Sequence, residues 1–224
     1  MIPLSRRSAL AHRTALKSAN GQASLKERPY DGKLILRGKY ESINAPVQGV
    51  LDARLPQAAG GTSQGPHANL QWLSPDEWLI VTEPNLVGTV AEKLSAALSG
   101  THSQITDVTD FYTTIELTGA RAREMLMKIA TIDFHPLAFK PGMCVTTNFG
   151  RTVAWARQPR EDAFDLIVRI SMADYLWCLL AAAGREWGLP QQEPKGGKVK
   201  LHLPHLEAPA ADTGNDAPAD LEIT

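Results

Sequence analysis

The sequence of 224 residues contains only two cysteines, Cys144 and Cys178, so it cannot build a disulfide framework. Because free thiols are typical of a reducing compartment, we expect a cytoplasmic protein. A membrane helix needs about 18–20 consecutive apolar residues, and the longest apolar run, 175–183, reaches about half that length. The formal net charge of −1 argues against a general nucleic-acid binder. We therefore expect neither a membrane nor a nucleic acid as partner.

The N-terminal segment has no acidic residue before Glu27 and lacks the continuous apolar stretch of a secretory signal. Its basic residues are Arg6, Arg7, Arg13 and Lys17. The composition also fits a transit peptide. We favour an extended arm, residues 1–31, that docks on an acidic surface of a partner protein.

The C-terminal segment, residues 189–224, is dominated by Pro, Gly, Ala and acidic residues and shows no apolar periodicity. Such a composition predicts a disordered tail. His202 and His205 have helical spacing, but Pro204 separates them, and no cysteine pair or carboxylate cluster accompanies them. The sequence therefore predicts no metal site.

Between these ends, residues 32–188 show alternating strand and helix patterns that predict an α+β core. The expected strands are 33–38, 67–73, 77–81, 111–117, 144–149, 152–157 and 164–169. The expected helices cover 86–98 and 122–129, and a third begins at Ser171 with Asp174 in a capping box. Residues 39–67, rich in glycine and proline, are expected to be mostly loop.

The order of these elements recurs, which predicts two pseudo-repeats, residues 32–100 and 105–188. The matching landmarks are Gly38 and Trp72 with Gly119 and Trp155, and Leu79–Val81 with Leu166–Val168. Each of the two tripeptides lies in a strand that leads into a helix. We infer two similar α+β lobes that are continuous through a shared sheet.

Residues 131–144 place Asp133, His135 and Cys144 close together in the sequence, between a helix and a strand. A nucleophilic cysteine needs a neighbouring base, so a Cys–His–Asp site is one reading. The other is that Cys144, flanked by Met143 and Val145, is a small buried hydrophobe at the start of a strand. We favour packing, because Pro136 also restricts His135 to an extended conformation.

The last helix is apolar on more than one side, and Trp177 lies away from the centre of its main apolar face. Trp177 either covers the core of its own chain or contacts another chain, because exposed aromatic side chains mark interfaces. We favour the interface.

Several segments resemble the gamma subunit of heterotetrameric sarcosine oxidase. The clearest is IDFHPLAFKPGMC at residues 132–144, followed by SPDEWLI at 74–80, DVTD at 107–110 and SMADYLW at 171–177. The N-terminal RRSALAH at residues 6–12 also fits. The chain departs from the family pattern at Leu137, where arginine is usual, and at Val145 and Thr146.

The resemblance implies a fold related to the folate-binding aminomethyltransferases and a non-catalytic subunit beside alpha, beta and delta chains. Such a complex oxidises sarcosine to glycine with O₂ and passes the one-carbon unit to tetrahydrofolate. FAD, FMN and NAD belong to the other chains, and zinc to delta. The alternative is a free-standing, folate-binding aminomethyltransferase-like protein. Its folate candidates here are Asp107, Asp110 and Arg169. The residues expected at a partner interface are Arg6, Arg7, His135, Phe139 and Trp177.

Overall fold

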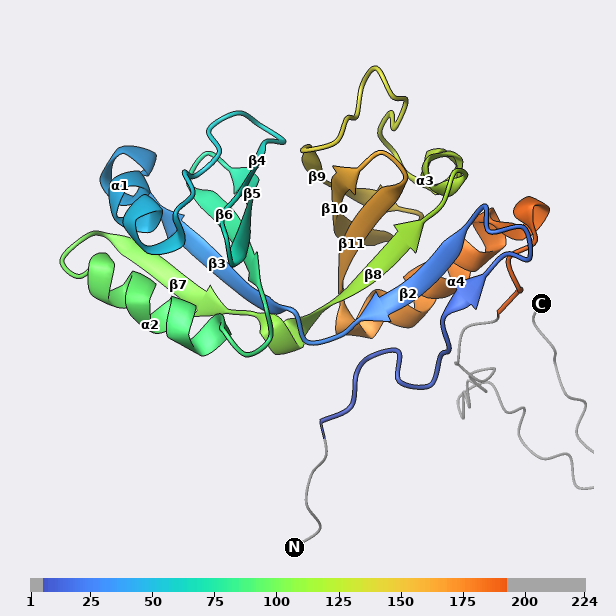
Figure 1. Ribbon diagram of the computed structural model, residues 1–224, viewed down its shortest axis with the longest axis horizontal. Coiled ribbons are helices and arrows are strands. Elements are labelled where there is room, and N and C mark those ends of the chain that lie inside the picture. The colour runs from blue at the N-terminus through green and yellow to red at the C-terminus, as the bar shows by residue number, and fades with distance from the viewer. Residues whose placement is uncertain (1–5, 193–224) are drawn as a thin grey trace, which may run out of the picture. The chain divides into compact units, whose positions relative to one another are not determined.

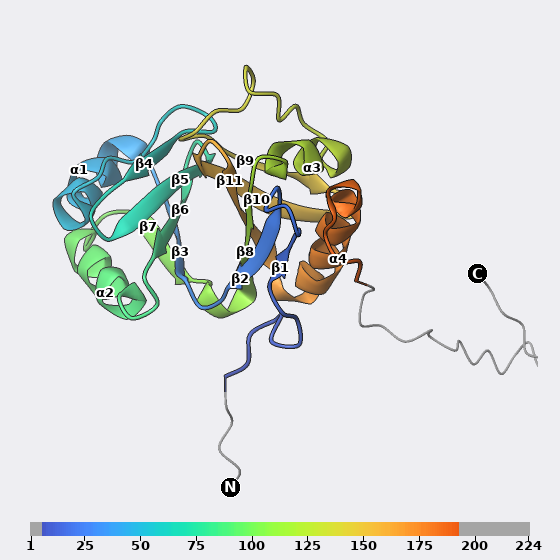
Figure 2. The ribbon, with the colours of Figure 1, turned by 45° about the vertical axis from the view of Figure 1, so that its right-hand side comes forward.

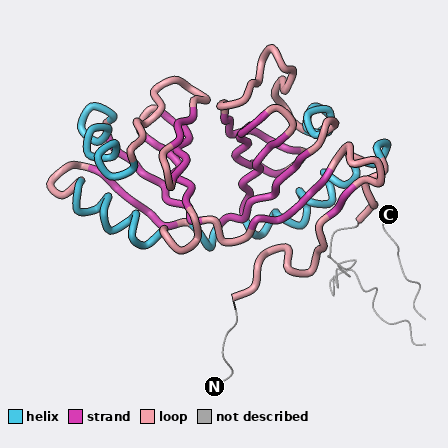
Figure 3. Tube along the Cα trace, viewed as in Figure 1, coloured by secondary structure: helices cyan, strands magenta, loops and turns pink. Residues whose placement is uncertain are grey.

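The computed structural model describes residues 6–192, which form two antiparallel sheets, each with two α-helices (Figures 1 and 3). This confirms the predicted α+β class. The predicted disordered tail, 189–224, is wrong at its start, because Leu189 is buried and Gln192 accepts a hydrogen bond from Trp177; residues 193–224 lie outside the described residues. No helix within residues 6–192 is long and apolar enough to cross a membrane.

The first lobe holds the five-stranded sheet, in the order β4-β5-β6-β3-β7. Its strands are β3 (Gly32–Gly38), β4 (Thr62–Gln64), β5 (Ala68–Ser74), β6 (Glu77–Thr82) and β7 (Ser103–Asp107). Its helices are α1 (Tyr40–Leu51) and α2 (Val87–Ala97). The two helices cover one face of the sheet (Figure 1).

The second lobe holds the six-stranded sheet, in the order β1-β2-β8-β11-β10-β9. Its strands are β1 (Leu16–Lys17), β2 (Ser24–Arg28), β8 (Tyr112–Thr118), β9 (Cys144–Phe149), β10 (Thr152–Arg160) and β11 (Ala163–Arg169). Its helices are α3 (Ala122–Ile129) and α4 (Ala173–Ala183). Short 3-10 turns lie at Thr109–Phe111, Ile170–Met172 and Arg185–Trp187.

Read from β4 and from β9, the two sheets have the same strand order. The fifth strand in this order, however, comes from a different part of the chain in each lobe. In the first lobe, β7 follows α2 in the chain. In the second lobe, the equivalent strand is β2, which precedes the whole first lobe. The chain thus crosses between the lobes twice, through 29–31 and through 108–111 (Figure 2).

This arrangement corrects the predicted arm of residues 1–31, because β2 is a paired strand of the sheet. Leu25 is fully buried and lies opposite Leu117 of β8. Gly119, just after β8, has φ of +116°, and a Cβ on it would lie 2.3 Å from the carbonyl oxygen of Gln22. Only glycine fits here, so the N-terminal segment passes directly against the end of β8.

The two lobes match in their strands but not residue for residue, and each has its own sheet, which corrects the expectation of a shared one. Leu79–Val81 lies in β6 and Leu166–Val168 in β11, which occupy matching positions in the two sheets. In β6, however, Ile80 packs in the core under the helices, whereas in β11 the flanking Leu166 and Val168 do so. Since side chains alternate along a strand, the two tripeptides are out of phase by one residue.

Helix α1 lies within residues 39–67, which we expected to be mostly loop. Pro46 stands inside the helix, where proline removes a backbone hydrogen bond, and it hides the helical pattern from sequence reasoning. The apolar residues Ile43, Val47 and Leu51 follow one another at intervals of four and are all buried. Burial of this face against the sheet outweighs the local cost of the proline.

Each lobe has its own hydrophobic core between helices and sheet. The second contains four phenylalanines in mutual contact, with ring centroids 4.8–6.5 Å apart. They are Phe134, Phe139, Phe149 and Phe164. In the first, Trp78 is the one aromatic residue among the buried core residues that the structure describes. The faces of both sheets away from the helices carry mainly polar side chains, and a cavity between them is lined from both lobes.

Candidate functional site

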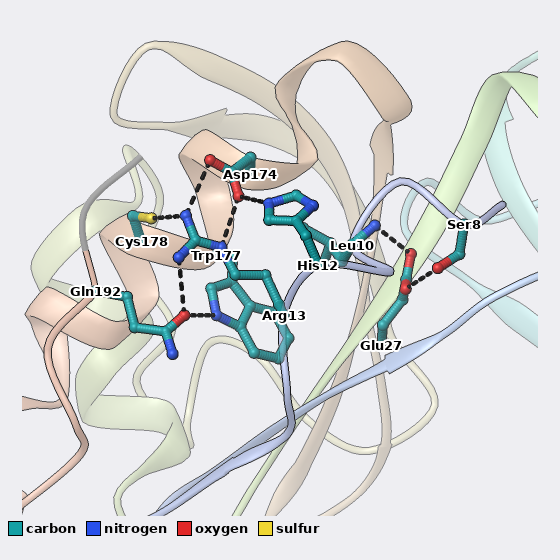
Figure 4. Close-up of polar contacts among 9 residues, drawn as sticks. All are labelled: Ser8, Leu10, His12, Arg13, Glu27, Asp174, Trp177, Cys178 and Gln192. Carbon is teal, nitrogen blue, oxygen red and sulfur yellow. Dashed lines mark hydrogen bonds and ion pairs between the residues drawn. The ribbon is translucent and has the colours of Figure 1, made fainter. Parts of the chain in front are cut away.

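The N-terminal segment is held on the first turn of α4 by Arg13 (Figure 4). Its Nε and Nη2 atoms donate to the two carboxylate oxygens of Asp174 at 2.7 and 3.0 Å, and His12 Nε2 lies 2.7 Å from Oδ1. The hydrogen bond with Asp174 raises the pKa of Arg13. Such bidentate hydrogen bonds between an arginine and a carboxylate are strong and directional. Arg13, one of the basic residues expected to meet a partner, instead fastens the segment to its own chain.

The same contact corrects the predicted capping box at the start of the last helix. Helix α4 begins at Ala173, after a 3-10 turn, and its N-cap residue Met172 makes no side-chain capping bond. The Asp174 carboxylate is drawn to the guanidinium of Arg13, because a charged donor makes a stronger hydrogen bond than a neutral backbone amide.

Trp177 is 1% exposed and packs in the core of the second lobe, which corrects the expectation that it is an exposed interface residue. Its Nε1 donates to Oε1 of Gln192 at 2.8 Å, and the same oxygen accepts from Arg13 Nη1 at 3.2 Å (Figure 4). Arg13 Nη2 also lies 3.3 Å from the sulfur of Cys178. Burial raises the pKa of this thiol, which is typical of a structural rather than a nucleophilic cysteine.

Glu27 on β2 fixes the segment at a second point. Its carboxylate accepts from Ser8 Oγ at 2.7 Å and from the backbone N–H of Leu10 at 3.2 Å (Figure 4). It also accepts from Thr113 Oγ1 at 2.8 Å. Leu10 is buried in the core of the second lobe. The segment is therefore docked by both apolar and charged contacts.

Arg6 and Arg7, two of the residues expected at a partner interface, are exposed. Arg6 forms an ion pair with Asp110, and its guanidinium lies 4.2 Å from the ring centroid of Tyr30. Both partners belong to the crossings between the lobes. Because Asp110 is occupied in this way, one of the three folate candidates already has a cationic partner within the chain.

The other two folate candidates, Asp107 and Arg169, have different contacts within the chain. The carboxylate of Asp107 accepts the backbone N–H of Thr109 at 2.9 Å. Arg169 lies over the ring of Phe111, at 5.5 Å, and lines a cavity of about 460 Å³ on the helix-free face of the second sheet. Neither aspartate is among the lining residues, which are Tyr112, Thr146, Arg151, Thr152, Val153, Ala154, Trp155, Ile167, Arg169 and Met172.

The segment 131–144 is an ordered loop whose aromatic residues point into the second lobe. Phe134 and Phe139 are buried with ring centroids 4.8 Å apart, and Arg123 donates to both of their carbonyl oxygens. Phe139, expected at an interface, therefore packs inside its own chain. His135 is exposed, and its backbone N–H donates to the carboxylate of Asp133 at 2.7 Å.

Cys144 lies at the junction of the lobes. Its thiol donates towards the carbonyl oxygens of Gly61 at 3.3 Å and Trp72 at 3.4 Å, both in the first lobe, and its backbone N–H binds the carbonyl oxygen of Gly60. Burial raises the pKa of this thiol to about 11, which disfavours the thiolate that a nucleophile requires. These surroundings fit a small, buried packing residue better than a nucleophile.

The residues described contain no group of three His, Cys, Asp or Glu side chains that could hold a metal ion. His202 and His205 lie outside the described residues.

A charged network lies between the lobes. Arg28 on β2 donates to Asp31 at 2.6 Å, to Asp165 at 3.0 Å and to Glu116 at 3.2 Å. Burial disfavours its charge, but the attraction of Asp165 and Asp31 outweighs that effect and raises the pKa of Arg28. This network borders an inter-lobe cavity of about 310 Å³, which sequence reasoning missed because its lining residues come from five separate stretches of the chain.

The two lobes, with their common strand order, define a fold that also occurs in an aminomethyltransferase. The solved glycine cleavage system aminomethyltransferase T from Bartonella henselae matches with a TM-score of 0.54 at 14% identity, covering 73% of this chain and 46% of that chain. The solved heterotetrameric sarcosine oxidase from Corynebacterium sp. U-96, in complex with pyrrole 2-carboxylate, matches more fully. Its TM-score is 0.73 at 23% identity, covering 84% of this chain and 99% of that chain.

The chain belongs to the sarcosine oxidase gamma subunit family, whose model matches residues 39–186. This confirms the resemblance seen in the sequence. The sarcosine oxidase subunit gamma of Arthrobacter sp. is 28% identical over 185 residues, covering 81% of this chain and 89% of the relative. The subunit gamma of Corynebacterium sp. (strain P-1) is 26% identical over 170 residues, covering 74% and 82%.

Proposed function

We propose that this chain is the non-catalytic gamma subunit of a cytoplasmic, heterotetrameric sarcosine oxidase and binds alpha, beta and delta chains. The family match over residues 39–186, which spans parts of both lobes, carries this proposal. Two further observations support the non-catalytic part of this proposal. Both cysteine thiols are buried with raised pKa values, and Arg13 is engaged within the chain.

The complex would oxidise the N-methyl group of sarcosine with O₂, giving glycine and H₂O₂, and pass the one-carbon unit to tetrahydrofolate. FAD, FMN and NAD would be bound by other chains, and zinc by delta. The role of this chain would then be to hold the larger chains in place. Its buried thiols and the ion-paired Arg28 network suit a rigid support, because satisfied buried polar groups specify one arrangement.

Exposed apolar side chains are the surfaces best suited to such contacts. Leu137, at the tip of the ordered loop 131–144, is 80% exposed. Phe111, Val153 and Ile170 are 52%, 53% and 49% exposed and lie near the ends of neighbouring strands of the second sheet. Exposed apolar groups that gather on a folded protein mark contact sites. Arg7 and His135 are also exposed, so both side chains are accessible to a partner.

Co-purification tests the subunit role. Expressed with alpha, beta and delta chains, the protein should be retained at a fixed ratio on a tagged alpha chain, and alone it should bind no flavin. Leu137→Asp should weaken retention, because it places a charge in an apolar contact. Ser95→Asp on the exposed side of α2 is the matched control and should leave retention unchanged. A chain that ignores all three partners would contradict the proposal.

The second candidate is a free-standing, folate-binding aminomethyltransferase-like protein, favoured by the cavity around Arg169. Tyr112 and Trp155 lie in its wall with ring centroids 4.4 Å apart and ring planes tilted by 35°, and Arg151 and Arg169 add two positive charges. Aromatic rings and guanidinium groups together suit a flat ligand with carboxylates.

Calorimetry with tetrahydrofolate tests this second candidate. It predicts heat of binding for the full-length chain without partners, lost in Arg169→Ala and kept in Arg37→Ala, a control arginine in the first lobe. No heat at near-millimolar tetrahydrofolate would remove it and leave the subunit proposal intact.

A further inference from the structure

The inter-lobe cavity holds polar atoms that lack partners among the residues the structure describes. Gln71 and Asn69 lie on β5 and face away from the helices, because their neighbours Ala68 and Leu70 pack in the first core. They are only 2% and 8% exposed, yet Gln71 Oε1 and Asn69 Oδ1 accept no hydrogen bond from residues 6–192. Both residues line the cavity of about 310 Å³.

The opposite wall of the cavity offers an unused donor. Arg157 on β10 has its Nε buried with no partner in residues 6–192, and its Nη2 lies 3.4 Å from Asp165. Arg28 beside it differs, because its guanidinium already binds three carboxylates. A buried polar atom without a partner is costly and calls for a partner such as a ligand or a bound water.

The two walls call for opposite chemistry. The amide oxygens of Gln71 and Asn69 need N–H donors, and Arg157 needs an acceptor that is best if anionic. The charged side chains that line the cavity are Arg28, Arg157, Asp31, Glu83 and Asp165. Because both signs of charge are present, a lone anion or a lone cation would meet repulsion. A volume near the lower limit for ligand sites favours a small molecule.

We propose that this cavity binds a small zwitterion of the amino-acid class, with its ammonium group on Gln71 and Asn69 and its carboxylate on Arg157. The site joins the two lobes, since β5 belongs to the first sheet and β10 to the second. It rests on the cavity alone and does not depend on the proposed subunit role.

Titration of the full-length chain, purified with any chains that accompany it, tests the proposal with glycine as probe and with acetate and methylamine as its two halves. Calorimetry should detect glycine binding, and both halves should bind at least about tenfold more weakly, because each leaves one wall unpaired. Gln71→Leu and Arg157→Leu should each weaken glycine by about tenfold. An affinity for glycine that is unchanged in both variants would mean that glycine binds elsewhere and would overturn the assignment.

Thr114→Val is the matched control. Thr114 is fully buried, and its hydroxyl lacks a partner among the described residues, but it does not line the cavity. This variant should keep the affinity for glycine. Loss of glycine binding in Thr114→Val equal to that in Gln71→Leu would show a general loosening of the sheet and contradict the proposal.

Gln71→Leu has a second readout in the absence of ligand. Removal of an unpaired buried oxygen should raise the melting temperature of the free chain, while the weaker binding reduces the shift that glycine causes. If this variant misfolds, Gln71→Glu keeps the acceptor and should bind methylamine more tightly than the parent chain does. No binding of any probe would mean that water alone occupies the cavity, and acetate as strong as glycine would mean an anion site. Either result refutes the proposal.

Discussion

The two lobes share a strand order but differ in how they are completed. The first lobe takes all its strands from one continuous stretch, β3 to β7, whereas the second borrows β2 from a segment that lies before the first lobe in the chain. The comparison shows that a repeated architecture need not be a repeated sequence unit. The second lobe depends on the N-terminal segment for its edge and for the contacts of Arg13 and Glu27.

The lobes also differ in what fills them. Four touching phenylalanines and Trp177 pack the second core, whereas the first depends mainly on aliphatic side chains around Trp78. If the aromatic cluster dominates the second core, the largest single effect on stability should lie there.

Phe134→Ala should lower the free energy of unfolding by about 4 kcal/mol, because it leaves a cavity at the centre of the phenylalanine cluster. Chemical denaturation followed by tryptophan fluorescence measures the change. Phe111→Ala, at a site 52% exposed, is the control and should cost less than about 1 kcal/mol. Since the chain crosses between the lobes twice, both should lose stability together; a first lobe that unfolds at its original midpoint would contradict the coupling.

Lys33, a buried lysine of the first lobe, should make the stability of the chain depend on pH. It is fully buried on the helix-free face of β3, and burial lowers its pKa to about 8, from 10.5. Between those values the unfolded chain holds a proton that the folded chain has released, so stability should rise with pH by up to about 3 kcal/mol from this group. The gain is complete above the unfolded pKa and is lost as pH falls through the folded one.

The free energy of unfolding is measured for the parent chain and for Lys33→Met between about pH 7.5 and about pH 10.5. This range runs from just below the folded pKa of Lys33 up to its unfolded pKa. The variant should lack the Lys33 contribution to the rise. Parallel curves would show that the lysine is hydrated and that its pKa is not lowered.

Leu25→Ala and Ile105→Ala compare the two strands that occupy equivalent positions, β2 and β7. Leu25 is fully buried and Ile105 only partly, so the losses should be about 3 and about 1 kcal/mol. Thermal unfolding of both variants gives the difference. Equal losses would mean that β2 is no more important to its lobe than β7 is to the other.

Arg13→Ala should release the N-terminal segment from α4 at a cost of about 2 kcal/mol, because it removes charge-assisted hydrogen bonds to Asp174. Hydrogen exchange in residues 8–16 should speed up while β8 stays protected. Arg13→Lys keeps the charge without the two-pronged geometry and should fall between the two. Unchanged exchange in the alanine variant would show that Leu10 and Glu27 suffice.

The regular elements with undisturbed periodicity could be predicted within a few residues. Helix α3 is an example, because Met125 and Leu126 face the core while its charged residues lie outside. Helix α1 escaped prediction because Pro46 interrupts its pattern, and tertiary burial rather than local preference decides its state. Strand β2 escaped because its five residues include three charged ones, and only pairing with β8 makes it a strand.

Candidate sites were harder to predict, because they depend on which segments meet. Arg13 was visible as a basic residue, but its partner Asp174 lies 161 residues away in the sequence. Trp177 was correctly placed on a helix, yet its exposure depended on the core around it and on Gln192. The inter-lobe cavity has no local sequence signal, since Gln71 and Arg157 become neighbours of one space only in the folded chain.

The position of β2 in the sequence also delays the folding of the second lobe during translation. Lys26 of β2 pairs with Glu116 of β8, and the whole first lobe is translated between them. At roughly 5–20 residues per second, the ribosome leaves β2 without its partner for about 5–20 s after it is made. During that interval Leu25, which is buried in the folded chain, is available to chaperones, so the second lobe cannot complete its sheet until β8 has been made.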